Sequence, residues 1–525
     1  SGSAWLSFGS FVSRVLGVIY LIPWLAMIGS YSNQLNAQAV FNSSYTPYAI
    51  LIAVGTAGLP SVIARYVSKM NSEGNYEESK YVFQLGFMIM LITGIICGGV
   101  LYALAPWIAS NSPVSSVKQG TLSIRMLVPA IAILPSMSML RGWFQGNNDL
   151  KPYGISQIIE QVARVIFIII STFIIIYVFN INYIVAVYFS VLGAFIGSLF
   201  SYIYLLMYNK SSVRFLSIKR KYRKKKIIID IYELWHQAIP FVLIGSIITL
   251  CQFVDQIFFK QILMDHMGYT SEYTNYLYTV ASANPSKITT IIISIGLSIS
   301  EATLPVLSGI PLSRVDKIRN TIKNNYSLIF FMLTPTVIIL SFVSGPIYVV
   351  LFHPDKVGSY YLVQNIIQCI FLGLSINILT IFQSLHNSRK AVKMVVWGLI
   401  AKILLQFPCV YLFKANGIIY STDIVFFVIC VYGFYYLDNK YFIRIKDLFA
   451  IIWSNVILIL SLILYSFTFN CLNVKMNKIE YILYICIYSL IFSLYYLYIS
   501  NILGSTKIVF GKKVGYKYFK YKHFK

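Results

Sequence analysis

The chain has 525 residues, of which 58% are hydrophobic and only 11% are charged. Soluble domains carry roughly 25% charged residues, so this composition excludes an ordinary soluble protein and indicates a membrane chain. The formal net charge of +25 would suit a nucleic-acid-binding protein only if the cations were gathered on one surface, so their placement along the chain decides what they mean.

Apolar runs of about 20 residues recur along the chain, each long enough to cross the ~30 Å hydrocarbon core of a bilayer. No basic leader with a small-residue cleavage site precedes the first run, so we expect no cleaved signal peptide. Prolines inside several runs are expected to be tolerated, because neighbouring helices satisfy the freed backbone groups. The pattern predicts an all-α polytopic membrane protein with about fourteen transmembrane helices, at 4–28, 38–66, 81–109, 121–145, 153–178, 182–208, 237–263, 276–307, 325–352, 360–385, 391–413, 416–437, 447–468 and 479–503.

The positions of the Lys and Arg residues test this topology. With the N-terminus inside, 31 of the 42 cations fall in cytoplasmic connections, and five fall outside, at Lys118, Lys356, Lys414, Lys475 and Lys478. This asymmetry follows the positive-inside rule and predicts that both termini are cytoplasmic. It also removes the reason to expect nucleic-acid binding. The basic run from Lys219 to Lys226 is interpreted as a topology anchor on anionic lipid, with a regulatory or partner-binding role as the alternative.

Two stretches 238 residues apart resemble each other. Phe144-Gln145 through Arg164 aligns with Phe382-Gln383 through Lys402, which places a cation in each copy. A duplication in a membrane chain indicates two halves with a substrate path between them. We therefore expect two pseudo-symmetric six-helix lobes followed by two further helices. The predicted parts are an N-terminal lobe at 1–209, a basic cytoplasmic linker at 210–235, a C-terminal lobe at 236–437, the added helices at 438–504 and a basic tail at 505–525.

Charges inside the predicted spans are the first place to look for function. A charge at membrane depth costs roughly 2.5–3.5 kcal/mol on insertion scales, so each one needs a partner, a water-filled cavity or a route to the interface. The cations are Arg14, Arg125, Arg164, Lys260, Lys287 and Lys402, and the acids noted with them are Glu160, Asp255 and Glu301.

These charges differ in the role that their surroundings predict. Arg14 has no acid nearby in the sequence, so we expect it to line a cavity. Lys287 follows Asn284-Pro285-Ser286, a plausible helix break, and a cavity position and a structural one stay equally open for it. Glu160 and Arg164 lie four residues apart and pair with each other in one interpretation, with substrate binding as the other. Arg125 and Lys260 lie near span ends, from which their side chains can reach the interface.

Catalytic constellations are largely absent. The five His residues show no metal-ligand spacing, the seven Cys residues form no CxxC pair, and no phosphate-binding glycine loop occurs. We therefore expect no catalytic residue, no metal site and no cofactor. The pattern favours a transporter over an enzyme.

Several motifs resemble one family. They are Ser13-Arg14-Val15-Leu16-Gly17, Gly58-Leu59-Pro60-Ser61, Arg141-Gly142-Trp143-Phe144-Gln145-Gly146, Gln157-Ile158-Ile159-Glu160-Gln161 and Gly345-Pro346-Ile347-Tyr348. Together they resemble the Gram-positive branch of the MurJ-type lipid II flippases, the YtgP and stage V sporulation B relatives, over about residues 5–435. These belong to the multidrug/oligosaccharidyl-lipid/polysaccharide (MOP) exporter superfamily.

The resemblance implies translocation of an undecaprenyl-diphosphate-linked peptidoglycan precursor across the bacterial cytoplasmic membrane. Arg14 matches the first-helix arginine of the family, and Arg125, Arg164, Lys287 and Lys402 are the other candidates for the diphosphate cavity. Tyr20 stands where the Gram-negative branch has a second arginine. The two C-terminal helices would form a groove for the lipid tail.

The resemblance also sets expectations for coupling and partners. Asp255, Glu301 and Glu160 are candidates for coupling to H⁺ or Na⁺, with the membrane potential as the alternative. We expect a monomer that meets cell-wall synthesis proteins. The remaining possibilities are a flippase for a capsule, teichoic-acid or O-unit precursor, a drug or cation antiporter, a septal polymerase-type glycosyltransferase and a non-transporting scaffold. The positive charge of Arg14 in the expected cavity argues against a cationic substrate.

Overall fold

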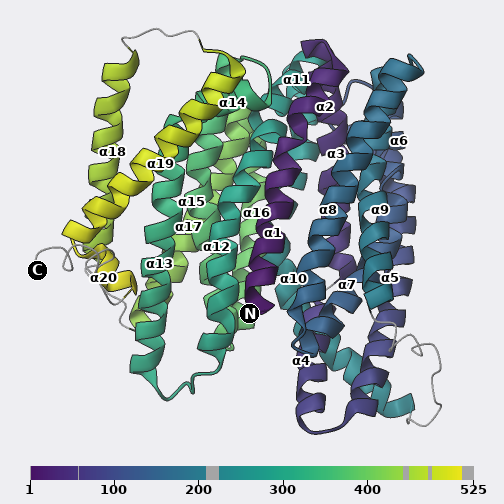
Figure 1. Cartoon of the computed structure of the whole chain (residues 1–525), viewed down its shortest axis with the longest axis vertical. Coiled ribbons are helices and arrows are strands. Elements are labelled where there is room, and N and C mark those ends of the chain that lie inside the picture. The colour runs from purple at the N-terminus through teal and green to yellow at the C-terminus, as the bar shows by residue number, and fades with distance from the viewer. Residues whose placement is uncertain (1, 57, 209–223, 442–447, 471–475, 511–525) are drawn as a thin grey trace, which may run out of the picture. The chain divides into compact units, whose positions relative to one another are not determined.

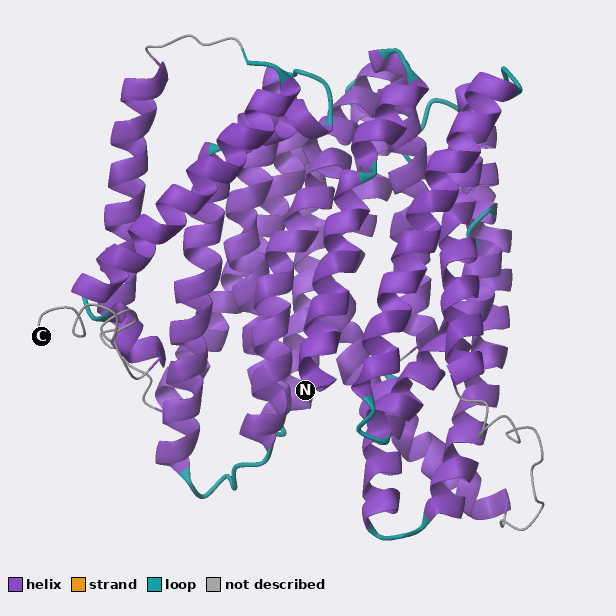
Figure 2. Cartoon of the chain, in the orientation of Figure 1, coloured by secondary structure: helices purple, strands orange, loops and turns teal. Residues whose placement is uncertain are grey.

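The computed structural model describes residues 2–56, 58–208, 224–441, 448–470 and 476–510, and over these ranges helices make up all of the regular structure (Figure 2). Twelve helical segments in the described chain are long and apolar enough to cross a membrane, and Val12–Ile28 adds a shorter apolar one. Helices suit this environment because they satisfy their own backbone hydrogen bonds. The predicted all-α polytopic membrane protein is therefore confirmed, with about twelve to thirteen long apolar helices in the described part of the chain.

Packing divides the chain into two compact units (Figure 1). Unit 1 comprises Ser1–Thr279 and Ile403–Ile418, and unit 2 comprises Val280–Lys402 and Ile419–Lys525. These units differ in extent from the two pseudo-symmetric lobes expected at 1–209 and 236–437. The division into these lobes stays a prediction. The basic run from Lys219 to Lys226 begins outside the described residues. Most of the predicted tail, from 511 onward, also lies outside them.

Unit 1 is built around a core of apolar side chains from α4, α5, α7 and α9, among them Ile63, Phe83, Met139 and Leu205. α10 belongs to this unit because Gln256 donates from Nε2 to the Ser43 carbonyl oxygen at 2.9 Å. Its elements are α1 (Gly2–Ile19), α2 (Leu21–Ile28), α3 (Tyr31–Thr56), α4 (Leu59–Ser72), α5 (Tyr76–Asn111), α6 (Val117–Arg125), α7 (Val128–Gly146), α8 (Leu150–Phe173), the π-helical turn η1 (Ile174–Val178), α9 (Tyr183–Tyr208), α10 (Lys224–Lys260), the π-helical turn η3 (Gln261–His266) and α11 (Ser271–Tyr278).

Unit 2 has α15 at its centre, since 83% of the most apolar stretch of that helix is buried, against 17% of the corresponding stretch of α19. α19 crosses obliquely past α13 (Figure 1) and packs on α13, α14 and α18. The unit contains α12 (Asn284–Ser308), α13 (Val315–Phe342), α14 (Ser344–Leu351), α15 (Lys356–Ser384), α18 (Phe449–Asn470), α19 (Lys478–Ile502) and α20 (Ser505–Phe510). The π-helical turn η4 (Thr279–Ala283) precedes α12, and α16 (Ser388–Phe413) and α17 (Ala415–Tyr441) contribute to both units.

Prolines end helices at several points where the sequence predicted continuous spans. α1, α3, α6 and α13 end at Ile19, Thr56, Arg125 and Phe342, each four residues before a proline (Pro23, Pro60, Pro129 and Pro346). Proline has no N–H to donate to that carbonyl, and its ring clashes with it. Gly58 also adopts φ +66° at the second break. The segments predicted at 4–28, 38–66, 121–145 and 325–352 therefore each contain a break between two helices.

Other prolines leave their helices continuous. Pro135 lies inside α7, Pro240 inside α10 and Pro335 inside α13, as the sequence analysis expected. Neighbouring helices compensate for the missing hydrogen bond in such a bundle. Proline alone therefore does not fix where a membrane helix ends.

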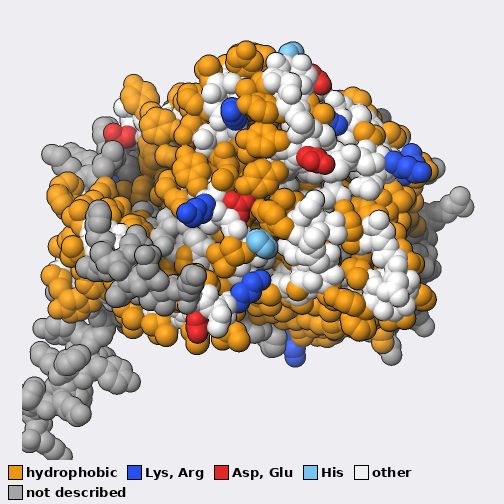
Figure 3. All heavy atoms as spheres, turned by 90° about the horizontal axis from the view of Figure 1, so that it is seen from above, with side chains coloured by type: hydrophobic (Ala, Val, Ile, Leu, Met, Phe, Trp, Pro, Cys, Tyr) orange, Lys and Arg blue, Asp and Glu red, His pale blue; other side chains and the backbone are white. Residues whose placement is uncertain are grey.

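The end of the molecule that carries α11 is seen from above in Figure 3. Charged side chains on this face are few and scattered among hydrophobic and uncharged groups. The orientation in the membrane stays a prediction.

Candidate functional site

Arg14 lies in the middle of α1, which packs along α8. A Cβ atom on Gly9 would lie 2.5 Å from the Gly154 carbonyl oxygen, and one on Gly17 would lie 3.2 Å from Gln161 Nε2. The two glycines therefore mark the face of α1 that meets α8. Arg14 is partly exposed in the structure.

Two arginines share one glutamate inside unit 1. Arg164 Nη2 lies 2.7 Å from Glu160 Oε1, and Arg141 Nη2 lies 2.9 Å from Glu160 Oε2. The side chains of Arg141, Glu160 and Arg164 are only 13%, 16% and 19% exposed. The pair expected from the i,i+4 spacing of Glu160 and Arg164 is therefore present. The sequence analysis named Arg141 only as part of the motif Arg141-Gly142-Trp143 and did not identify it as a partner of Glu160.

This ion triad joins three helices. Arg141 extends from α7 and donates from Nε to Ser156 Oγ of α8 at 2.9 Å, and from Nη2 to Ser201 Oγ of α9 at 3.1 Å. Two cations on one carboxylate leave a net charge of +1. A buried group of this kind is stable only when its hydrogen bonds are satisfied, which the serine hydroxyls help to do.

Gly197 brings α9 close to the triad and provides a test of that packing. A Cβ atom there would overlap the Glu160 carbonyl oxygen and lie 3.0 Å from Arg164 Cβ. We expect Gly197→Ala to destabilise the protein by about 1–3 kcal/mol, since the backbone has to shift. Thermal unfolding in detergent measures the change.

The matched control for this substitution is Gly99→Ala, also within a helix. No atom lies within 4 Å of a Cβ atom at Gly99, so the variant is expected to be neutral or stabilised by up to ~1 kcal/mol. Equal melting temperatures for the two variants would contradict the close approach of α9 to α8.

The Arg164 guanidinium, which belongs to the ion triad, also has three tyrosines near it. Tyr20, Tyr45 and Tyr48 lie near its guanidinium. Arg164 Nε is buried and has no hydrogen-bond partner among the described residues. Arg164 therefore places positive charge near Tyr20 from a different helix.

The other predicted cations have identified neighbours. Arg125 lies over the Tyr102 ring, with 4.2 Å from its guanidinium carbon to the ring centroid, and Lys260 donates from Nζ to the Ser110 carbonyl oxygen at 2.7 Å. Lys287 is partly exposed in the first turn of α12, and the predicted helix break before it appears as the π-helical turn η4. Lys402 is fully buried in α16. The assignment of Arg125, Lys287 and Lys402 to a substrate cavity stays a prediction.

The three predicted acids lie in different surroundings. Glu160 belongs to the ion triad, Asp255 is buried in α10, and Glu301 is exposed on α12. Asp423 on α17 was missed, although the run Ser421-Thr422-Asp423 interrupts the apolar span at 416–437. Within the described part of the chain, no three His, Cys, Asp or Glu side chains gather as metal ligands would.

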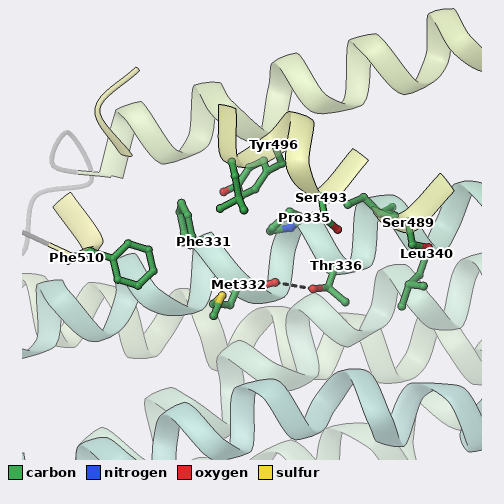
Figure 4. A pocket seen from close by; sticks show the side chains of 11 residues that line it. Phe331, Met332, Pro335, Thr336, Leu340, Ser489, Ser493, Tyr496 and Phe510 are labelled. Carbon is green, nitrogen blue, oxygen red and sulfur yellow. Dashed lines mark hydrogen bonds between the residues drawn. The ribbon is translucent and has the colours of Figure 1, made fainter. Parts of the chain in front are cut away.

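An apolar pocket of about 370 Å³ lies between α13, α19 and α20 (Figure 4). Phe331, Pro335 and Leu340 line it from α13, and Ser493 and Tyr496 line it from α19. The Thr336 hydroxyl donates to the Met332 carbonyl oxygen at 2.8 Å within its own helix, which leaves the wall largely apolar. All of these residues belong to unit 2.

The profile of the family described as "Polysaccharide biosynthesis protein" matches residues 1–310, more than half of the chain. The chain belongs to this family. A curated relative, "Lipid II flippase MurJ" of Bacillus subtilis (strain 168), is 29% identical over 460 residues, which cover 82% of this chain and 81% of the relative.

Solved structures show that this chain has a MurJ- and MATE-like fold. "Lipid II flippase MurJ, inward closed conformation" superimposes with a TM-score of 0.66 and 16% identity, covering 96% of this chain and 99% of that one. An inward-facing multidrug resistance MATE family transporter of the MOP superfamily gives a TM-score of 0.59 at 14% identity, over 81% of this chain and 93% of that one. The predicted resemblance to MurJ-type flippases of the MOP superfamily is confirmed.

Proposed function

We propose that this protein is a flippase that moves the undecaprenyl-diphosphate-linked peptidoglycan precursor, lipid II, across the bacterial cytoplasmic membrane. The observation that carries the proposal is the similarity to Bacillus subtilis MurJ over 460 residues. We further propose fourteen spans arranged as two six-helix lobes plus two C-terminal helices, with both termini cytoplasmic. Transport occurs by alternating access through a cationic cavity.

Arg14 is the residue that we assign to the diphosphate. A diphosphate is anionic and does not cross hydrocarbon unaided, whereas a planar guanidinium pairs bidentately with phosphate oxygens. The middle position of Arg14 in α1 and its partial exposure support the assignment. Arg164 and Lys287 are the second candidates, because Arg164 has an unpartnered Nε atom among the described residues and Lys287 is partly exposed.

The pocket between α13, α19 and α20 is proposed to hold part of the polyprenyl tail. Its lining is aromatic and aliphatic, with ring centroids 5.3 Å apart between Phe331 and Tyr496. Burying an isoprenoid chain there removes the apolar surface of the chain from contact with water in the polar cavity that the head group crosses. The tail then stays anchored in one place while the head group crosses.

Filling this pocket tests the assignment. Ser493→Trp places an indole between α13 and α19, so we expect lipid II flipping to fall at least ~10-fold at unchanged expression, equivalent to about 1.4 kcal/mol. The control is Leu494→Trp, at a neighbouring position that is 58% exposed on the same helix and outside the pocket. Equal activity of the two variants in a flipping assay would remove the pocket from the substrate path.

The proposal includes no cofactor. Energy would come from an H⁺ or Na⁺ gradient or from the membrane potential, with Asp255, Glu301 and Glu160 as the acids named for coupling. Anionic lipid is the proposed partner of the run from Lys219 to Lys226, and cell-wall synthesis proteins are the proposed protein partners of a monomer.

The second candidate is a flippase for another lipid-linked glycan, which the description of the matched family favours. Expression in two hosts separates the candidates, one depleted of its lipid II flippase and one lacking a capsule-precursor flippase. Rescue of growth in the first host alone supports lipid II. Restored capsule in the second host with no rescue of the first would overturn that proposal.

A further inference from the structure

One face of α12 is polar along most of the helix. Every residue of α12 is described, and none of its large apolar side chains before Val306 is exposed. With 3.6 residues per turn, five polar residues share a single face of the helix, which we call the polar face of α12. They are exposed or partly exposed, and they are Lys287, Thr290, Ser294, Ser298 and Glu301.

The opposite face of α12 packs inside unit 2. A Cβ atom on Gly296 would lie 3.1 Å from Gly373 Cα of α15. Asn377 of α15 donates from Nδ2 to the buried Ser300 Oγ at 3.1 Å. The polar face of α12 is therefore turned away from the core of this unit.

A helix face that meets lipid is normally apolar, and the polar face of α12 is not. α19 of the same unit exposes Leu483 and Leu490, at 56% and 62%. Charged side chains in transmembrane helices almost always face a bundle interior or a water-filled cavity. Because Lys287 and Glu301 place a charge toward each end of the polar face, this face is typical of a surface that meets water.

Two serine hydroxyls between these charges present acceptor oxygens. Ser298 Oγ donates to the Ser294 carbonyl oxygen at 2.8 Å, and Ser294 Oγ donates to the Ile291 carbonyl oxygen. A hydroxyl has one proton to donate and two lone pairs with which to accept. Since both protons are donated within the helix, the two oxygens act toward a ligand as acceptors.

We propose that the polar face of α12 binds the glycan of the lipid-linked precursor and selects a neutral glycan over an acidic one. The proposal rests on the proposed function. Sugar hydroxyls and amide N–H groups donate to serine oxygens, whereas ionised carboxylates and phosphates only accept. At 1.5 Å per residue, the face extends about 21 Å from Lys287 to Glu301, the length of about six extended amino-acid residues, so it accommodates more than one sugar unit.

The binding of three lipids to the purified full chain tests this selectivity. They are undecaprenyl diphosphate, the same lipid carrying an uncharged N-acetylated disaccharide, and the same lipid carrying a disaccharide of uronic acids. Wild type is expected to bind the neutral glycolipid at least ~5-fold more tightly than undecaprenyl diphosphate, as two hydrogen bonds allow. The acidic glycolipid should bind no more tightly than undecaprenyl diphosphate.

The double variant Ser294→Ala with Ser298→Ala removes both acceptors. Alanine favours a helix more than serine does, so the variant should fold. It is expected to lose the preference for the neutral glycolipid and to bind undecaprenyl diphosphate as wild type does. The control is Ser461→Ala on α18, a partly exposed serine whose Oγ donates to the Leu458 carbonyl oxygen at 2.8 Å, and it should keep the preference.

The outcomes separate this inference from the proposed function. Equal affinity of wild type for undecaprenyl diphosphate and the neutral glycolipid, or a preference that survives in the double variant, would overturn the role of α12 alone. Tighter binding of the acidic glycolipid than of the neutral one would do the same. If wild type bound none of the three lipids, both the inference and the proposed function would be wrong.

Discussion

Replacing Arg14 with alanine is expected to abolish lipid II flipping, whereas Arg14→Lys should retain part of it. Losing a desolvated contact to a charged group typically costs about 2–5 kcal/mol, which lowers the rate at least ~30-fold. Lysine keeps the charge but not the bidentate geometry of a guanidinium. Outer-leaflet lipid II, labelled with an impermeant reagent in a host depleted of its own flippase, measures the effect.

The control for Arg14 is Arg389→Ala, an exposed arginine at the start of α16. It removes the same charge from a surface position, so flipping should be unchanged. If both Arg14 variants behave as wild type while Arg164→Ala does not, the diphosphate meets the protein at Arg164 and the assignment of Arg14 is wrong.

Replacing Glu160 with alanine is expected to have the largest effect on stability. The substitution leaves Arg141 and Arg164 buried together without their shared carboxylate, and breaking a buried pair in this way costs about 3–5 kcal/mol. Glu160→Gln keeps the volume and part of the hydrogen bonding, so its loss should be intermediate. Thermal unfolding in detergent gives the order of the variants.

A solvent-exposed ion pair provides the comparison for Glu160. Glu73 is 45% exposed and lies 4.0 Å from Lys69, so Glu73→Ala should change the free energy of unfolding by no more than about 1 kcal/mol. The ion triad would have no special role in stability if Glu160→Ala melted at the same temperature as Glu73→Ala.

Much of the fold can be predicted from the sequence because membrane helices are recognised by their length and hydropathy. The segment at 360–385 appears as α15, and the segment at 391–413 appears within α16. Helix breaks were harder to predict. Pro60 and Pro346 end helices, whereas Pro335 does not, and the difference depends on neighbours that a single sequence does not show.

The candidate site was predictable only where partners are close in sequence. Glu160 and Arg164 are one helical turn apart, so their pair follows from spacing. Arg141 and Glu160 are on different helices, and so are Lys402 and Ser421. No periodicity brings such side chains together, because their contact depends on which helix faces pack.

The same limit explains why Asp423 was missed. It is a single carboxylate in an apolar span, and the residues near it, Lys402 of α16 and Gln368 of α15, come from other helices. Lys402 was assigned to the substrate cavity because a charge in a span suggested function. In the structure the Lys402 ammonium group is buried and donates to two hydroxyls of α17.

Reconstituted transport is the most direct test of the proposed function. The purified chain would be placed in liposomes containing either lipid II or an undecaprenyl-diphosphate carrying a different glycan, and the fraction of each lipid that becomes accessible from the opposite leaflet would be followed with time. Faster crossing of lipid II with wild type than with Arg14→Ala is the predicted result. Crossing of the other lipid alone, or no difference between wild type and Arg14→Ala, would contradict the account.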